Sequence, residues 1–210
     1  LAGGSVLAVA GASFARPALI NPCRAAIPVA LLDSPWLRQA WAGIDPAGVW
    51  DCHVHLAELG DGGSGIEIGP QLSTPLKPVH YAQRLFYMNA GCAHDAPGKV
   101  DTAYVARLLN LCDAMPEGFK VMLFAFAHFH DPAGQAHPEH SAFYVPNAWA
   151  AKLAREFPAR FEWVASLHPY HASAVDELQQ AIADGACAVK WLPAAQGMDP
   201  ASAQCDAFYR

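Results

Sequence analysis

Apolar runs that suit β-strands alternate along this sequence with segments that have helical spacing. The apolar runs lie at 49–56, 120–130, 161–170 and 186–193. Helices are predicted over 79–90, 101–115, 147–156 and 172–184, where most apolar residues recur every three or four positions. Such alternation favours a parallel sheet with functional side chains at the carboxyl ends of its strands, as in a (βα)8 barrel or a doubly wound sheet. No G-x-G-x-x-G motif follows the first run, which weakens a dinucleotide-binding fold.

These elements make about four βα units, which is half of a (βα)8 barrel. An open half barrel leaves one sheet edge and much of its core exposed. The last residues, 207–210, read as part of the helix after the fourth strand. We therefore expect an α/β fold, the N-terminal half (about four βα units) of a (βα)8 TIM-type barrel within a longer protein. A barrel built from two chains is the less favoured arrangement.

The first apolar run ends in Asp51-Cys52-His53-Val54-His55-Leu56. Side chains alternate along a strand, so Asp51, His53 and His55 are predicted to share one face. Two imidazoles one residue apart can converge on a single divalent cation. The glycine-rich loop at 60–65 also favours a functional site over packing. The alternative is that both histidines hydrogen-bond to neighbours without a metal.

Lys190 lies in the fourth apolar run, between Val189 and Trp191. Burying an unpaired ammonium group costs several kcal/mol and favours the neutral amine. Carboxylation of the lysine or a nearby carboxylate would remove that cost. Alternatively, the amine reaches the strand end near Pro193 or pairs with Asp51.

Two further apolar runs end in histidines. A second His-x-His, formed by His128 and His130, closes the run at 120–130, and His168 closes the run at 161–170. We predict that His130 and His168 line a substrate pocket and that His128 is a packed histidine.

Composition excludes several classes of protein. Hydrophobic residues make up 53% of the chain and charged residues 15%, as in a globular protein with a buried core. The net charge of −6 offers no basic surface for nucleic acid. The body of the chain contains no run of 18 or more apolar residues, so no membrane-spanning helix is predicted there.

The six cysteines have no C-x-x-C spacing, which makes a structural zinc finger improbable. Cys52 and Cys187 are predicted to be small buried hydrophobes. The other four, Cys23, Cys92, Cys112 and Cys205, could pair in an exported protein, with partners that the sequence leaves open.

Residues 1–20 resemble the apolar region and cleavage site of a secretory signal peptide, ending near Ser13-Phe14-Ala15. An ordinary buried first helix is the alternative. Residues 21–48 are predicted to be a linker with one short helix near 34–43, and 49–210 the barrel. This organisation predicts export to a bacterial periplasm, or membrane anchoring on its outer side, with a cytoplasmic location as the alternative.

Together, the segment 51–56 and the segment Gly185-Ala186-Cys187-Ala188-Val189-Lys190-Trp191-Leu192-Pro193 resemble the amidohydrolase superfamily, in particular amidohydrolase-2 type metal-dependent hydrolases. The resemblance covers 49–210 and implies a (βα)8 barrel with one or two divalent metal ions, most commonly Zn²⁺. It implies that His53 and His55 are metal ligands and that Lys190 is a third, carboxylated to bridge two ions in some members. The remaining ligands, and an aspartate after the eighth strand that would act as general base, would come from later strands, so no catalytic base is assigned.

The resemblance implies a hydrolase acting on a small-molecule amide, ester or related bond. The alternatives are a metal-dependent decarboxylase of the same fold, a non-catalytic half barrel, and a periplasmic solute-binding module without metal. A homo-oligomer is compatible with the sequence.

Overall fold

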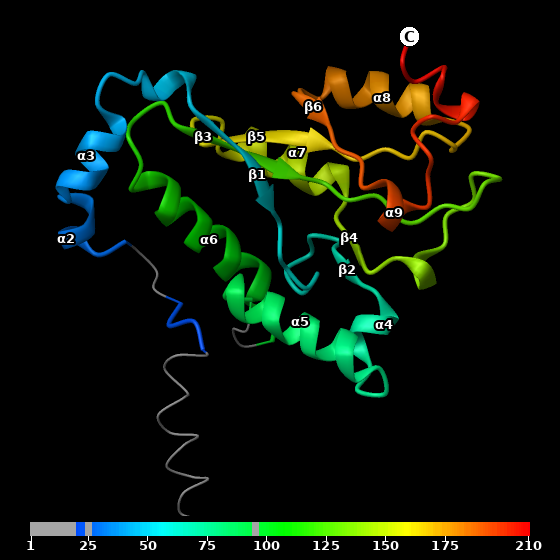
Figure 1. The fold of residues 1–210 in the computed structure, drawn as a ribbon, viewed down its shortest axis with the longest axis horizontal. Coiled ribbons are helices and arrows are strands. Elements are labelled where there is room, and N and C mark those ends of the chain that lie inside the picture. Colours follow the sequence, from blue (N-terminus) through cyan, green and yellow to red (C-terminus); the bar gives the residue numbers. More distant parts are fainter. Residues whose placement is uncertain (1–19, 24–26, 94–96) are drawn as a thin grey trace, which may run out of the picture.

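The structure is a computed structural model that describes residues 20–23, 27–93 and 97–210. The predicted signal-peptide-like segment lies outside the described residues except for Ile20. Figure 1 shows a central sheet with helices packed around it.

A four-stranded parallel sheet forms the centre of the molecule, as the sequence predicts. Its order is β1-β3-β5-β6, so strands that follow one another along the chain also pair in the sheet. The strands are shorter than the apolar runs, and the sheet curls, with β1 turned away from the direction of β5 (Figure 1). Their bounds are Trp50–His55 (β1), Lys120–Phe124 (β3), Phe161–Ala165 (β5) and Ala188–Val189 (β6). The fold is therefore mixed α/β with a curled parallel sheet.

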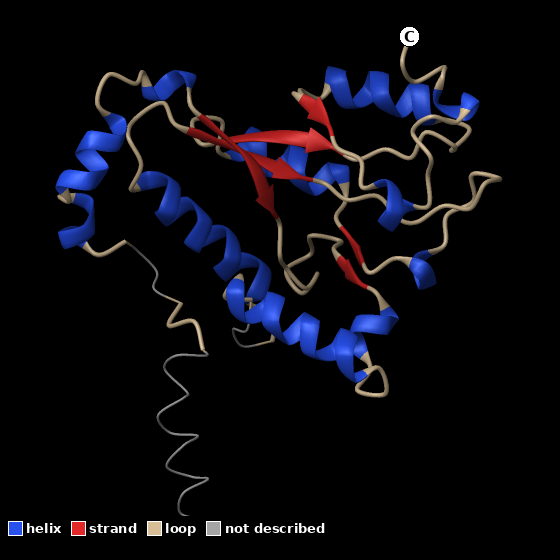
Figure 2. Ribbon diagram, viewed as in Figure 1, coloured by secondary structure: helices blue, strands red, loops and turns tan. Residues whose placement is uncertain are grey.

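Three crossover helices connect these strands, and their apolar side chains join the core on one face of the sheet. Leu123, Phe161 and Trp163 are almost fully buried in this core. Along β3 and β5, every second side chain points to this face and the others point to the opposite face, as in any pleated sheet. The helices contribute Val105, Cys112, Ala150, Leu153 and Ala181 to the same cluster. They are α6 (Val100–Asp113), α7 (Asn147–Glu156) and α8 (Ala174–Ala183), shown in Figure 2.

A second, two-stranded sheet adjoins the carboxyl ends of the central strands. It pairs β2 (Glu67–Ile68) antiparallel with β4 (Phe143–Tyr144). Beyond Phe124 the chain leaves the central sheet, because Phe126 pairs with Val145 instead. The prediction of one strand over 120–130 is therefore wrong beyond Phe124. The other elements here are α4 (Pro70–Ser73), α5 (Pro78–Ala90), η2 (Pro138–His140), α9 (Pro193–Gln196) and η3 (Ala203–Cys205).

Short helices precede the first strand: α2 (Val29–Leu32), α3 (Pro35–Trp41) and η1 (Pro46–Gly48). The single helix predicted over 34–43 corresponds to α3. A disulfide joins Cys23 to Cys92, just after α5, and so ties this N-terminal region to the body of the molecule. No helix among the described residues has the length and apolar character needed to cross a bilayer.

Among the remaining cysteines, Cys112 and Cys205 are buried thiols, whereas Cys52 and Cys187 are exposed. The prediction that Cys52 and Cys187 are buried is wrong. Cys52 lies in the edge strand β1 and Cys187 directly precedes the edge strand β6, and neither side chain is part of the helix-covered core.

Candidate metal centre and adjoining cavities

His53 and His55 bring their ring nitrogens together at the carboxyl end of β1. Their Nε2 atoms lie 3.0 Å apart. Both rings pack against Phe124 of the neighbouring strand, with centroid distances of 5.1 and 5.5 Å. The Tyr104 hydroxyl of α6 donates to the carbonyl oxygen of His55 at 2.6 Å, which anchors the end of the strand. The two imidazoles therefore converge on one point from an anchored backbone.

Asp51 does not share this face, and that prediction is wrong. The register of β1 against β3 shifts between Asp51 and Val54, as at a β-bulge. Asp51 is paired with Val121, which belongs to the helix-covered core, whereas His55 is paired with Phe124 on the other face. The extra residue of the bulge reverses the alternation between Asp51 and the histidines. The Asp51 carboxylate instead accepts a hydrogen bond from the backbone N–H of His53.

Lys190 reaches the same point from the opposite edge of the sheet. It directly follows β6, and its Nζ lies 3.3 Å from Nε2 of His53 and 3.7 Å from the ring centroid of Phe124. Because β1 and β6 are the two edge strands, only the curl of the sheet allows this contact. The predicted alternative of a Lys190–Asp51 pair is not the contact that the lysine makes.

The surroundings of this cluster lower the pKa of His55 and of Lys190. Burial, then the positive charge of Lys190 and the neighbouring His53, lower the pKa of His55. Burial also lowers the pKa of Lys190. Within the described part of the chain, none of these three side chains forms a hydrogen bond or ion pair with a carboxylate. The lowered pKa of His55 favours its neutral imidazole, which is the form that binds metal ions.

The spacing of the two imidazoles fits a tetrahedral metal ion. Two nitrogen ligands at about 2.0–2.1 Å from Zn²⁺ stand about 3.3 Å apart in a tetrahedral site. The observed separation of 3.0 Å differs from this by about 0.3 Å. His53 and His55 could thus hold one ion with small ring rotations, and a carboxylated Lys190 could supply an oxygen ligand.

A large cavity adjoins this cluster. It has a volume of about 640 Å³ and includes His55 in its wall. Its lining is mostly apolar, with Leu72, Met88, Phe126 and Phe143, and it also includes Arg84, whose Nε is buried without a hydrogen-bond partner among the described residues. Its size and character suit a small organic molecule.

His130 and His168 lie in a separate, smaller cavity. Their rings stack with centroids 4.2 Å apart, and both line a space of about 180 Å³ together with His128 and His171. His168 is 2% exposed, and both its nitrogens are used: Nε2 donates to the Gln196 carbonyl and Nδ1 accepts from the Tyr170 N–H. Burial and the adjacent His130 lower the pKa of His168 to about 4. His168 therefore packs as a neutral ring, and His130 is the ring that still offers an acceptor nitrogen, because its Nδ1 donates to the His128 carbonyl.

The glycine-rich loop after β1 is held by a buried carboxylate that the sequence does not reveal as a partner. Asp101, 1% exposed, accepts hydrogen bonds from the N–H groups of Leu59, Gly60 and Gly62 and from the Ser64 hydroxyl. In return, Asp61 of the loop accepts from N–H groups at the start of α6. The N–H groups of Gly60 and Gly62 are therefore occupied by a carboxylate of the protein itself.

Glu58 lies fully buried between this loop and α7. Trp149 Nε1 donates to its carboxyl oxygens at 3.1 and 3.3 Å. Burial raises the pKa of Glu58 to about 8, and the hydrogen bond from Trp149 opposes the shift only in part. The carboxyl is therefore mostly protonated at neutral pH.

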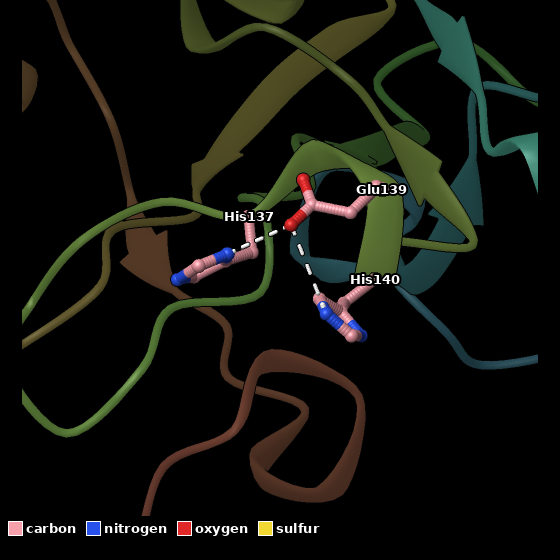
Figure 3. A group of neighbouring side chains, drawn as sticks. All are labelled: His137, Glu139 and His140. Atoms are coloured by element: carbon pink, nitrogen blue, oxygen red, sulfur yellow. Dashed lines mark hydrogen bonds and ion pairs between the residues drawn. The ribbon is translucent and has the colours of Figure 1, made fainter.

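A further group of potential metal ligands lies at η2: His137, Glu139 and His140. Figure 3 shows the three side chains directed toward one another around one Glu139 oxygen. Sequence reasoning missed this group. The His-Pro-Glu-His pattern at 137–140 was the available signal.

Comparison with protein-family models, with curated proteins and with solved structures finds no match for this chain.

Proposed function

We propose that the chain is part of a metal-dependent hydrolase of the amidohydrolase type, acting on a small-molecule amide, ester or related bond. The observation that carries this proposal is the convergence of His53, His55 and Lys190 from the two edge strands of the sheet. Side chains that meet across a sheet at its carboxyl end are the usual origin of active sites in α/β barrels.

A Zn²⁺ ion held here would supply activation of water and polarisation of the scissile carbonyl. His53 and His55 would hold the ion, and Lys190 would either become a ligand after carboxylation or, as an amine, orient the water. The cavity beside His55 holds the body of the substrate against Phe126 and Phe143. His130 of the smaller cavity offers a polar contact to substrate.

We further propose that the curled sheet is the N-terminal half of a (βα)8 TIM-type barrel. The sequential strand order with a helix in each connection supports this proposal. In that barrel, further ligands and the general base come from strands beyond these residues.

Export is proposed from the signal-like segment and is supported by the disulfide between Cys23 and Cys92. Disulfides form and persist in oxidising compartments such as the periplasm.

The proposal is tested with the full-length protein, purified without a tag, loaded with Zn²⁺ and assayed on p-nitrophenyl esters and p-nitroanilides. We expect turnover that chelation abolishes, that Zn²⁺ restores, and that His53→Ala reduces by at least about 100-fold. Arg155→Ala, an exposed substitution on α7 outside both cavities, serves as the control. Turnover that persists in the His53→Ala variant would refute the assignment. Release of CO2 from carboxylated substrates without hydrolysis would favour the decarboxylase alternative.

A further inference from the structure

The second cluster of metal-binding side chains lies on the connection between β3 and β4, around the short helix η2. His137 Nδ1 lies 2.8 Å from Glu139 Oε1, and His140 Nε2 lies 3.7 Å from the same oxygen. One ligand atom from each residue falls within 4.8 Å of the other two. The side chains are 28%, 59% and 64% exposed, so an ion can enter from solvent.

A carboxylate behind the cluster already orients His137. Asp131 Oδ2 lies 3.3 Å from His137 Nε2, on the side of the ring away from Glu139. The other oxygen of Asp131 accepts from the N–H groups of Ala133 and Gln135, both at 2.9 Å, so the carboxylate is fixed without help from the histidine. Metal-ligating histidines usually donate their second ring N–H to such a carboxylate, which selects the tautomer and orients the ring. Asp131 thus directs Nδ1 of His137 toward Glu139.

The loop that carries these residues is anchored on both sides. The His137 N–H donates to the Phe129 carbonyl at 2.8 Å, and the Phe129 N–H donates to the hydroxyl of buried Ser141 at 2.9 Å. Gly134 has a φ of +82°, and a Cβ there would collide with the carbonyl oxygen of Tyr170. The backbone beneath the cluster is therefore set by contacts that do not depend on an ion, which lowers the cost of binding one.

We propose that His137, Glu139 and His140 form a second divalent-cation site, with Zn²⁺ as the preferred ion and Asp131 as the positioning residue. Two imidazoles and one carboxylate are a known Zn²⁺ ligand set that leaves the fourth position to water. Ligand atoms about 3.2–3.5 Å apart suit tetrahedral Zn²⁺, so the exposed His140 ring, 3.7 Å from Glu139, would rotate toward the other two groups on binding. The bound ion would fix Glu139, which lines a cavity of about 320 Å³ with His128 and Tyr144.

A protonated His137 is the competing state of this cluster. Hydrogen bonds to Glu139 and then Asp131 raise the pKa of His137, so an imidazolium can bridge the two carboxylates without a metal. The proton on Nδ1 occupies the position that the ion would take. The ion must displace this proton, and direct binding measurements distinguish the two states.

The experiment is a Zn²⁺ titration by calorimetry at pH 7.5 on the untagged chain carrying His53→Ala and His55→Ala. These substitutions remove the proposed barrel site, so failure of the hydrolase proposal cannot be mistaken for failure of this one. We expect one equivalent of Zn²⁺ to bind with micromolar Kd. His140→Ala or Glu139→Gln should weaken binding at least about 30-fold, and Asp131→Asn about 10-fold or more.

His171→Ala is the matched control, because His171 pairs with Glu177 at 2.9 Å but belongs to no group of three potential metal ligands among the described residues. This variant should bind Zn²⁺ within a factor of two of its parent. Thermal unfolding of each variant without metal checks that the exposed substitutions leave the fold intact. The proposal is overturned if the parent binds no Zn²⁺ at 1 mM, or if His140→Ala and Glu139→Gln leave the affinity within a factor of three.

Discussion

The buried carboxyl of Glu58 makes a quantitative prediction about stability. Its pKa rises from 4.5 to about 8 on folding, mainly because the side chain leaves water. Each pKa unit corresponds to about 1.4 kcal/mol of free energy. A group with a raised pKa in the folded state contributes stability that is complete below its unfolded pKa and is lost as the pH rises. For Glu58, this loss begins near pH 4.5 and is nearly complete at about pH 8.

Glu58→Gln removes the ionisation but keeps the shape of the side chain and an oxygen that can accept from Trp149. For the unmodified chain, the ionisation of Glu58 lowers the free energy of unfolding by less than about 1 kcal/mol at pH 5 and by about 4 kcal/mol at pH 8. From pH 5 to pH 8, the free energy of unfolding of the variant should therefore rise by about 3 to 4 kcal/mol relative to that of the unmodified chain. An absolute offset from altered hydrogen bonding should be the same at both pH values.

The assay is urea denaturation at pH 5, 6.5 and 8, followed by far-UV circular dichroism. Glu156→Gln, on the exposed side of α7, controls for replacing a glutamate by glutamine. A difference between Glu58→Gln and the unmodified chain that stays constant within about 1 kcal/mol from pH 5 to pH 8 would show that Glu58 ionises freely in the folded state. That result would refute the reasoning from burial.

Three further predictions concern stability. Asp101→Asn should lower the free energy of unfolding in urea by about 2–4 kcal/mol, because an amide oxygen cannot accept all four hydrogen bonds. The exposed control Asp176→Asn should change it by less than about 0.5 kcal/mol. Equal effects of the two substitutions would contradict the role of Asp101 in holding the loop. Because the pKa of His168 is lowered to about 4, acid favours the unfolded chain, in which this histidine takes up a proton more readily. Between pH 7.5 and 4.5, the free energy of unfolding of the unmodified chain should fall by about 2–3 kcal/mol relative to that of His168→Gln. Parallel pH profiles of the two proteins would contradict this prediction. Reducing the Cys23–Cys92 disulfide, which spans 69 residues, should cost up to about 4 kcal/mol; an unchanged urea midpoint in dithiothreitol would show that the bond adds no stability.

The order of the central elements could be predicted from sequence because it depends on local patterns. Apolar runs and helical spacing located the strands and crossover helices, and parallel strands that follow one another with a helix between them tend to pair. The small sheet was missed, because β2 and β4 are two residues long and are separated along the chain by residues 69–142. Such a pair has no periodicity to detect.

The candidate site could be predicted only in part, because several of its contacts join residues that are far apart in the sequence. The spacing of His53 and His55 identifies neighbouring side chains on one strand, but alternation could not reveal the bulge that turns Asp51 to the other face. The contact between Lys190 and His53 joins positions 137 residues apart and depends on how strongly the sheet curls. Likewise, no local pattern shows that Asp101, at the start of a predicted helix, holds the glycine-rich loop, or that Asp61 of this loop accepts from the first N–H groups of α6.

The most direct test of the account is Zn²⁺ content. The full-length protein carrying His140→Ala, which removes the proposed surface site, is loaded with Zn²⁺, desalted and analysed by mass spectrometry of the metal. We predict one or two equivalents, lost when His53→Ala is added, and a fall from two to one with Lys190→Ala if the lysine bridges two ions. Zn²⁺ content that is unchanged by His53→Ala would contradict the claim that the paired imidazoles of β1 hold the ion.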